Sequence, residues 1–189
     1  MAKRSKETIT LGSGKVYITE FEKGSEIPAH ASLETQENLI GYISGGASLA
    51  YEPEFYEAKD DLGYVQKVII TNEEATFTSG VMTWNADTLG KLSATSRVTE
   101  DQAKGTRTLK IGGLSNQNGK QYLIRFVHED KTDGDVRITI VGQNQAGFTL
   151  EFAKDAETVV DAEFKAQPAL DDEGTLVIYE EQIEVVPAG

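Results

Sequence analysis

Two histidines are the side chains of this chain most suited to metal or proton chemistry. His30 falls in a long polar segment, and His128 ends an apolar strand pattern. Because the chain has no cysteine, a transition-metal site would depend on these two residues. Neither HExxH nor GxSxG, two common hydrolase signatures, occurs. We therefore expect structural or surface roles for both histidines and no transition-metal site.

Carboxylates are abundant, and they gather most closely around Gly134. Oxygen ligands of this kind bind Ca²⁺, but the spacing does not match an EF-hand, so a solvated hairpin turn explains the cluster better and ion binding stays open. The cluster comprises Glu129, Asp130, Asp133 and Asp135.

Two further sequence patterns do not have the arrangement that a catalytic or phosphate-binding site needs. Adjacent glutamates at 73–74 and 180–181 point to opposite faces of a strand, so neither pair is arranged for acid/base work. The segment 11–16 resembles a phosphate loop only faintly, because a strand pattern follows it instead of a helix. We predict that the chain is not an enzyme, with no catalytic residues, no cofactor and no bound metal.

The elements that would position any site are mostly strands. Alternating apolar and polar residues, separated by turn signals, predict an antiparallel sandwich or barrel. The expected strands lie at residues 15–21, 73–79, 106–111, 121–128, 136–141, 147–152, 159–166 and 175–179. One short flanking helix is expected over 85–94, capped by Asn85 or Asp87, with Leu89 and Leu92 on its apolar face.

The pattern over residues 43–71 predicts a long hairpin that protrudes from this fold. Its turn is at 60–63, and a slip in the alternation after Phe55 indicates a bulge in the outgoing strand. Pro53 supplies no N–H, so it belongs on an edge or at that bend. We expect this hairpin to be the assembly element. Its candidate residues are Leu49, Tyr51, Glu52, Glu54, Phe55, Asp60, Asp61 and Lys67.

The length and net charge of the chain limit its domain organisation and the functions it can have. The chain has 189 residues and a net charge of −13, which suits one β-sandwich domain and disfavours nucleic-acid binding by phosphate neutralisation. We expect an N-terminal arm over 1–13, a domain over 14–180 and a tail over 181–189. The polar segment 22–42 is too long for an ordinary connection, so we expect it to be mobile or ordered by a partner. No stretch approaches the roughly 20 apolar residues of a membrane helix.

Several stretches together resemble a known family. They are Gly45-Gly46, the hairpin 49–68, the strand 73–77, the Val-Met-Thr-Trp-Asn run at 81–85 and the segment 170–177. In their order along the chain and in their kinds of residue, they are similar to the major tail (tail tube) proteins of long-tailed bacteriophages of Gram-positive hosts. The likeness covers most of residues 14–180 and contains no invariant motif.

The resemblance implies a β-sandwich with a flanking helix that assembles into stacked, hexameric rings. Hairpins of neighbouring subunits would join into a barrel whose lumen conducts DNA without specific binding. Residues 47–71 would form one such hairpin, with Glu52 and Glu54 in an acidic wall. Segment 22–42 and the two arms would make ring-to-ring contacts. The protein would be made in the host bacterial cytoplasm, bind other tail proteins and end in the virion.

Three alternatives remain open. The chain could be a tube subunit of a contractile injection machine, which the sequence does not separate from a non-contractile tail. It could instead be a carbohydrate-binding or adhesin-like module, with exposed tyrosines stacking on sugars. A hydrolase that uses dispersed carboxylates has only the abundance of Asp and Glu in its favour.

Overall fold

The computed structural model describes residues 13–64, 66–155 and 157–183. It is mainly antiparallel β structure, as expected, with strands β1 Lys15–Phe21, β2 Leu39–Gly41, β3 Ile43–Lys59, β4 Gln66–Val81, β5 Arg97–Asp101, β6 Thr106–Lys110, β7 Gln121–His128, β8 Val136–Asn144, β9 Val160–Ala166 and β10 Val177–Glu181. The helices are α1 His30–Leu33 and α2 Ala86–Lys91, with a 3₁₀ turn at Leu114–Asn116. The expected arm 1–13 and tail 181–189 lie largely outside the described residues.

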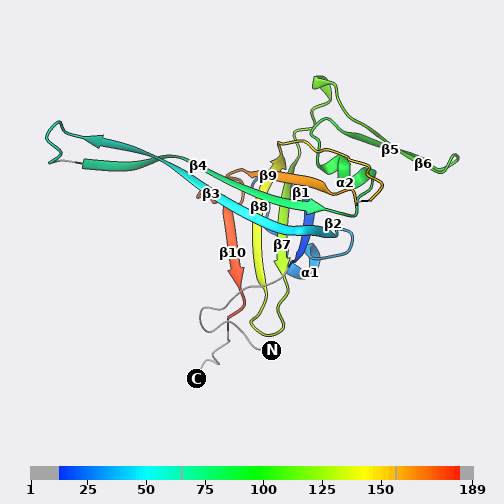
Figure 1. The fold of residues 1–189 in the computed structure, drawn as a ribbon, viewed down its shortest axis with the longest axis horizontal. Coiled ribbons are helices and arrows are strands. Elements are labelled where there is room, and N and C mark those ends of the chain that lie inside the picture. The colour runs from blue at the N-terminus through cyan, green and yellow to red at the C-terminus, as the bar shows by residue number, and fades with distance from the viewer. Residues whose placement is uncertain (1–12, 65, 156, 184–189) are drawn as a thin grey trace.

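Eight strands form one sheet that folds over on itself into two layers (Figure 1). The order is β2-β1-β7-β8-β9-β4-β3, and β10 pairs with β8. The first half of β8 pairs with β10 and its last residues pair with β9, so β8 belongs to both layers. At the other end of the order, β2 and β3 are separated only by Tyr42. The two ends of the strand order, β2 and β3, are therefore joined directly by the chain through Tyr42.

The main core fills the space between the layers. Phe77 of β4 and Phe164 of β9 are paired neighbours and are both almost completely buried. Ile18 and Ile124 face them from β1 and β7. Alternation along each strand, with a period of two, delivers these apolar side chains to one face. The closed strand path thus encloses the apolar side of both layers.

Helix α2 closes one end of this core. Asn85 is its cap, since the side-chain oxygen accepts hydrogen bonds from the backbone N–H groups of Asp87 at 2.9 Å and Thr88 at 3.0 Å. Leu89 and Leu92 are buried in the main core, as predicted. The helix is shorter than the expected 85–94, and Gly90 within it lies against Val98 of β5, where a larger residue would be crowded.

A second apolar cluster covers the opposite face of β1, β7 and β8. Leu33 and Ile27, from the segment between β1 and β2, pack there with Leu123 and Leu170. The expectation that residues 22–42 are mobile or ordered by a partner is therefore wrong. Apolar residues at 27 and 33 give this polar segment an anchor on its own sheet, and α1 forms within it.

Other differences concern strand boundaries. Residues 147–152, expected as a strand, form no regular element, although Phe148 and Leu150 do face the core. The two strands expected at 64–71 and 73–79 are one strand, β4, and β2, β5 and helix α1 were not predicted at all. Alternation identifies which side chains are buried, but it does not reveal whether a backbone partner lies alongside.

We predict that the paired phenylalanines dominate the stability of the core. Phe164→Ala should lower the free energy of unfolding by about 3–5 kcal/mol, because it leaves a cavity beside Phe77. Denaturant titration followed by circular dichroism measures this loss. The matched control is Phe152→Ala, because Phe152 is 79% exposed and should cost far less. Equal losses for the two variants would contradict this account of the core.

Candidate assembly surface

The hairpin β3–β4 extends far beyond the body of the molecule (Figure 1). Its two strands pair with each other from Ile43–Val81 to Lys59–Gln66. Strand β9 is much shorter and pairs with β4 only over Thr76–Val81. In the described part of the chain, β3 has no second neighbour, and β4 has none over residues 66–75. The projecting half of the hairpin therefore has two open edges.

The turn at the hairpin tip and the bulge are both present as predicted from the sequence, except that the bulge lies in the other strand. Gly63 has a φ of 72° and its N–H donates to the carbonyl of Asp60, so the expected turn is present. The ladder shifts between Glu54 and Phe55, which leaves Thr71 without a partner position. The bulge thus exists, but its extra residue is in the return strand rather than the outgoing one. Alternation within β3 alone could not show this.

The bulge sets which side chains share a face. Phe55 and Ile70 are paired and lie on the face that continues from Leu49 and the core. Tyr56 and Ile69 are paired and lie on the other face. These four side chains are 46–59% exposed, so the projecting ribbon presents apolar groups on both faces. At the tip, Leu62 and Tyr64 are more exposed still.

The structure places the predicted site residues in three groups. Leu49 is half-buried and packs against the core. Tyr51, Glu52, Glu54 and Phe55 are exposed along β3, and Pro53 lies among them on the edge strand. Asp60 and Asp61 form the turn, and Lys67 pairs with Ala58 on the return strand.

Tyr51 and Glu73 bind each other across the ribbon. The phenol of Tyr51 donates a hydrogen bond to the carboxylate of Glu73, and this bond raises the pKa of the tyrosine. Both side chains lie on the face opposite Glu52 and Glu54. The Tyr51 hydroxyl is therefore already engaged in a contact between the two strands of the ribbon.

An acidic face runs across three strands. Glu52 and Glu74 are paired on the outer side of β3 and β4, and Glu54 follows on the same side. Asp161 and Glu163 of β9 pair with Gly80 and Thr78 and so face the same way. We call these five residues the acidic face. Our sequence interpretation named only Glu52 and Glu54, although the alternation of β9 already placed 161 and 163 outward.

Lys165 is a cation within the acidic face. Its Nζ lies 2.7 Å from Glu74 and lowers the pKa of that carboxyl through a hydrogen bond. Nearby, the hydroxyls of Ser48 and Thr78 bond to each other at 2.5 Å. The face therefore combines negative charge with small polar side chains and has few apolar groups close to the body.

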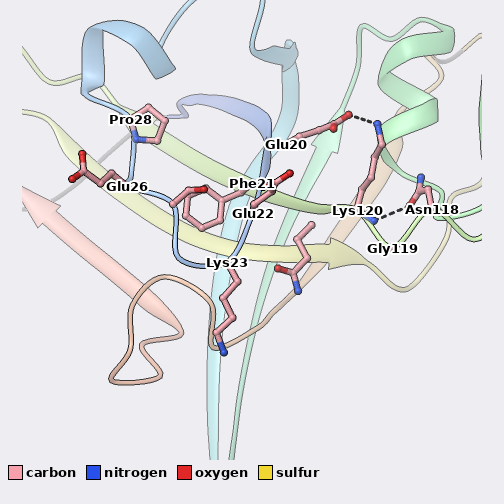
Figure 2. A pocket seen from close by; sticks show the side chains of 11 residues that line it. Glu20, Phe21, Glu22, Lys23, Glu26, Pro28, Asn118, Gly119 and Lys120 are labelled. Carbon is pink, nitrogen blue, oxygen red and sulfur yellow. Dashed lines mark hydrogen bonds and ion pairs between the residues drawn. The ribbon is translucent and has the colours of Figure 1, made fainter.

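A hollow lies elsewhere, where β1 ends (Figure 2). It measures about 710 Å³, and its lining combines glutamates at 20, 22 and 26 with Lys23 and Lys120. The side chains of Lys120 and Glu20 bind each other, which raises the pKa of the lysine. Figure 2 shows this pair at the rim, beside the contact between the Lys120 backbone and Asn118. We see no nucleophile–base pair among the lining side chains.

Both histidines have structural partners. His128 is buried and its Nδ1 bonds to the carbonyl of Ser13 at 2.7 Å. In the described residues, no group of three or more His, Asp or Glu side chains is placed to hold a metal ion. Near Gly134, Asp130 accepts hydrogen bonds from the N–H groups of Thr132 and Asp133, Asp135 accepts one from the N–H of Asp130, and Glu129 binds Lys15 at 2.7 Å.

His30 belongs to an ionic network on the sheet. Arg125 is 2% exposed, and its guanidinium lies 2.8 Å from Nδ1 of His30 and 3.4 Å from Glu34. Arg137 binds both oxygens of Glu34, at 2.7 and 3.1 Å. Glu180 of β10 completes the network, 3.7 Å from Arg125. These contacts hold α1 on β7, β8 and β10.

No protein-family model matches the chain, and no curated protein matches it significantly. In the described parts of the chain, no helix is long and apolar enough to cross a membrane.

The network predicts an acid-sensitive contribution to stability. Burial alone raises the pKa of Glu34, but the hydrogen bond and charge of Arg137, with His30 and Arg125, outweigh this and leave the pKa below its ordinary value. The stabilisation is therefore complete above the ordinary carboxyl pKa of about 4.3 and is lost as the pH falls through the lowered value.

Thermal unfolding as a function of pH tests this sign. Glu34→Gln should be less stable than the wild type at pH 7, and the two should converge as the pH falls below about 4. Glu37→Gln, in the same segment but exposed, is the matched control and should change little at pH 7. A gap between Glu34→Gln and wild type that widens at low pH would contradict the assignment.

Proposed function

We propose that this chain is a structural subunit that assembles with copies of itself into rings of the tail-tube type, and that the rings stack into a conduit for DNA. The observation that carries the proposal is the projecting half of the β3–β4 hairpin. It has open edges on both sides and apolar groups on both faces. A two-stranded ribbon of this kind is marginally stable alone in water.

Open edges favour pairing between copies. Unpaired N–H and C=O groups along a strand are a template for another strand, and ring closure removes such edges. The two open edges belong to different strands, β3 and β4 (Figure 1), so pairing of the β3 edge of one copy with the β4 edge of the next joins two different surfaces. A contact of this type closes into a ring when its rotation is suitable.

The acidic face supports the role of a DNA conduit. Duplex DNA carries about one negative charge per 1.7 Å of axis. Glu52, Glu54, Asp161 and Glu163 would repel the phosphates over roughly 8 Å at physiological ionic strength. The serine, threonine and alanine side chains between these carboxylates are small and uncharged, and Lys165, a cation within this face, is already bound to Glu74 at 2.7 Å. A lumen lined by this face would let DNA slide without sticking.

The alternative of a carbohydrate-binding module receives less support. Stacking on a sugar needs aromatic side chains that share a surface. Tyr51 and Tyr56 lie on opposite faces of the ribbon, and Tyr64 lies at its tip. Tyr51 is in addition hydrogen-bonded to Glu73. These tyrosines do not make one platform.

Removal of the projecting ribbon tests the proposal. The wild type should form rings or tubes at high protein concentration, seen by electron microscopy and by sedimentation. Replacing residues 53–73 by a two-residue Asn-Gly turn should give a folded monomer with an unchanged circular dichroism spectrum apart from the lost strand. Wild-type protein that stays monomeric, or a deletion variant that assembles as well as wild type, would contradict the proposal.

A further inference from the structure

A second, smaller hairpin, β5–β6, projects at the other end of the molecule's longest axis (Figure 1). Its charge differs from that of the chain as a whole. Residues 97–110 hold four cationic and two acidic side chains, a net charge of +2 in a protein of −13. Residues 51–75 of the long hairpin hold seven carboxylates and two lysines, a net charge of −5. The two projecting elements are therefore complementary in sign.

Two of the cations lie where they repel each other. Arg97 and Lys110 are directly opposite in the ladder of β5 and β6, an unfavourable arrangement for like charges. Arg97 donates to the carbonyl of Gly112 at 3.2 Å. Within the described residues, neither cation has a carboxylate partner. The other two cations differ, since Arg107 binds Glu100 and Asp87 and Lys104 binds Asp101.

Apolar side chains follow immediately after this pair. Ile111 is 51% exposed and Leu114 is 94% exposed. The bond from Arg97 to Gly112 keeps this segment next to the two cations. We call Arg97, Lys110, Ile111 and Leu114 the cationic patch.

The tip of the long hairpin has the matching composition. Leu62 and Tyr64 are among the most exposed large apolar side chains of the described chain, at 77% and 85%. Asp61 precedes Leu62 in the turn, and Glu57 lies in β3, where its carboxylate binds Lys59 at 2.9 Å and accepts a hydrogen bond from Gln66. Both surfaces thus combine exposed apolar groups with charge, and their charges are opposite.

We propose that the tip of the β3–β4 hairpin of one copy docks on the cationic patch of a second copy. The two surfaces lie far apart in one molecule, so the contact joins separate copies (Figure 1). It joins unlike surfaces and so propagates around a ring or along a stack. The inference rests on the proposed function and adds to it the surface on which the hairpin lands.

The two kinds of group have different tasks in this contact. Burial of Leu62, Tyr64 and Leu114 supplies affinity in proportion to the apolar area removed from water. The charges select the orientation and accelerate encounter, an effect that falls with salt. The Asp61 carboxylate also relieves the repulsion between Arg97 and Lys110, and Glu57 contributes by exchanging Lys59 of its own strand for these cations. Assembly should therefore be weaker at high ionic strength.

Charge reversal on each side, followed by the combination, tests the contact. Arg97→Glu with Lys110→Glu should weaken assembly by about tenfold or more, and Glu57→Lys with Asp61→Lys should do the same. A chain that carries all four substitutions should regain assembly, because the signs are again complementary. Sedimentation velocity over a concentration series at low and high salt measures each variant.

Controls separate this contact from general effects. Lys131→Glu, in the exposed turn between β7 and β8, makes the same change in net charge as Arg97→Glu alone and should assemble as the wild type does. Leu114→Ser tests the apolar half without a change in charge, and its high exposure excludes a folding defect as the cause of weaker assembly. It should also weaken assembly.

The outcomes distinguish the two proposals. Assembly of wild type that is insensitive to the reversals and to Leu114→Ser overturns the docking contact and leaves the tube function standing. Loss of assembly in both reversed variants without recovery in the combination also overturns the contact. Wild-type protein that never assembles overturns the proposed function and the contact with it.

Discussion

The length mismatch between β3–β4 and the strands beside them is the constraint on which the structure depends. β3 has 17 residues and β4 has 16, whereas β9, the next strand of the sheet, has 7. β4 has a strand on both sides over residues 76–81 and on one side only farther out, and β3 is an edge strand along its whole length. No side-chain change could remove this asymmetry, because it arises from the ladder itself. The apolar side chains on both faces of the projecting ribbon are also left exposed to solvent.

The body is built to hold this ribbon firmly. The closed path through Tyr42 makes β3 a continuation of β2, so the projecting strand is anchored in both layers. Among the described residues, apolar clusters lie on opposite faces of β1, β7 and β8. The ionic network around Arg125 then fixes α1 on the outer face. A rigid base of this kind lets a marginal ribbon keep a defined direction.

Alternation of apolar and polar residues was sufficient to predict most of this fold. It identified the hairpin and the ranges of β1, β7 and β9, while turn residues located the turn at Gly63 and the spacing of Leu89 and Leu92 gave the apolar face of α2. It failed where the decisive contact is between distant segments. Residues 147–152 alternate like a strand but lack a ladder partner, and Thr71 is an extra residue only in relation to β3. Leu33 seemed one apolar residue in a polar loop, yet it meets Leu123 about 90 residues away.

The candidate surface was predictable only in part for the same reason. The acidic residues of β3 are evident from their own strand, whereas Asp161 and Glu163 join them only through the pairing of β9 with β4. The cationic patch depends on the register that sets Arg97 opposite Lys110. Charge totals of the two hairpins can be counted from the sequence, but their placement at opposite ends of the molecule cannot.

The strand order also sets the sequence of events during synthesis. The β3–β4 hairpin is local and can form as soon as residue 81 is available, but its base is covered only when β9 arrives some 80 residues later. β1 likewise waits for β7, about 100 residues downstream. A ribosome must therefore complete nearly the whole chain before a firm platform exists. Unfinished chains therefore lack the β7 and β9 partners that hold β1 and the base of the β3–β4 hairpin in place.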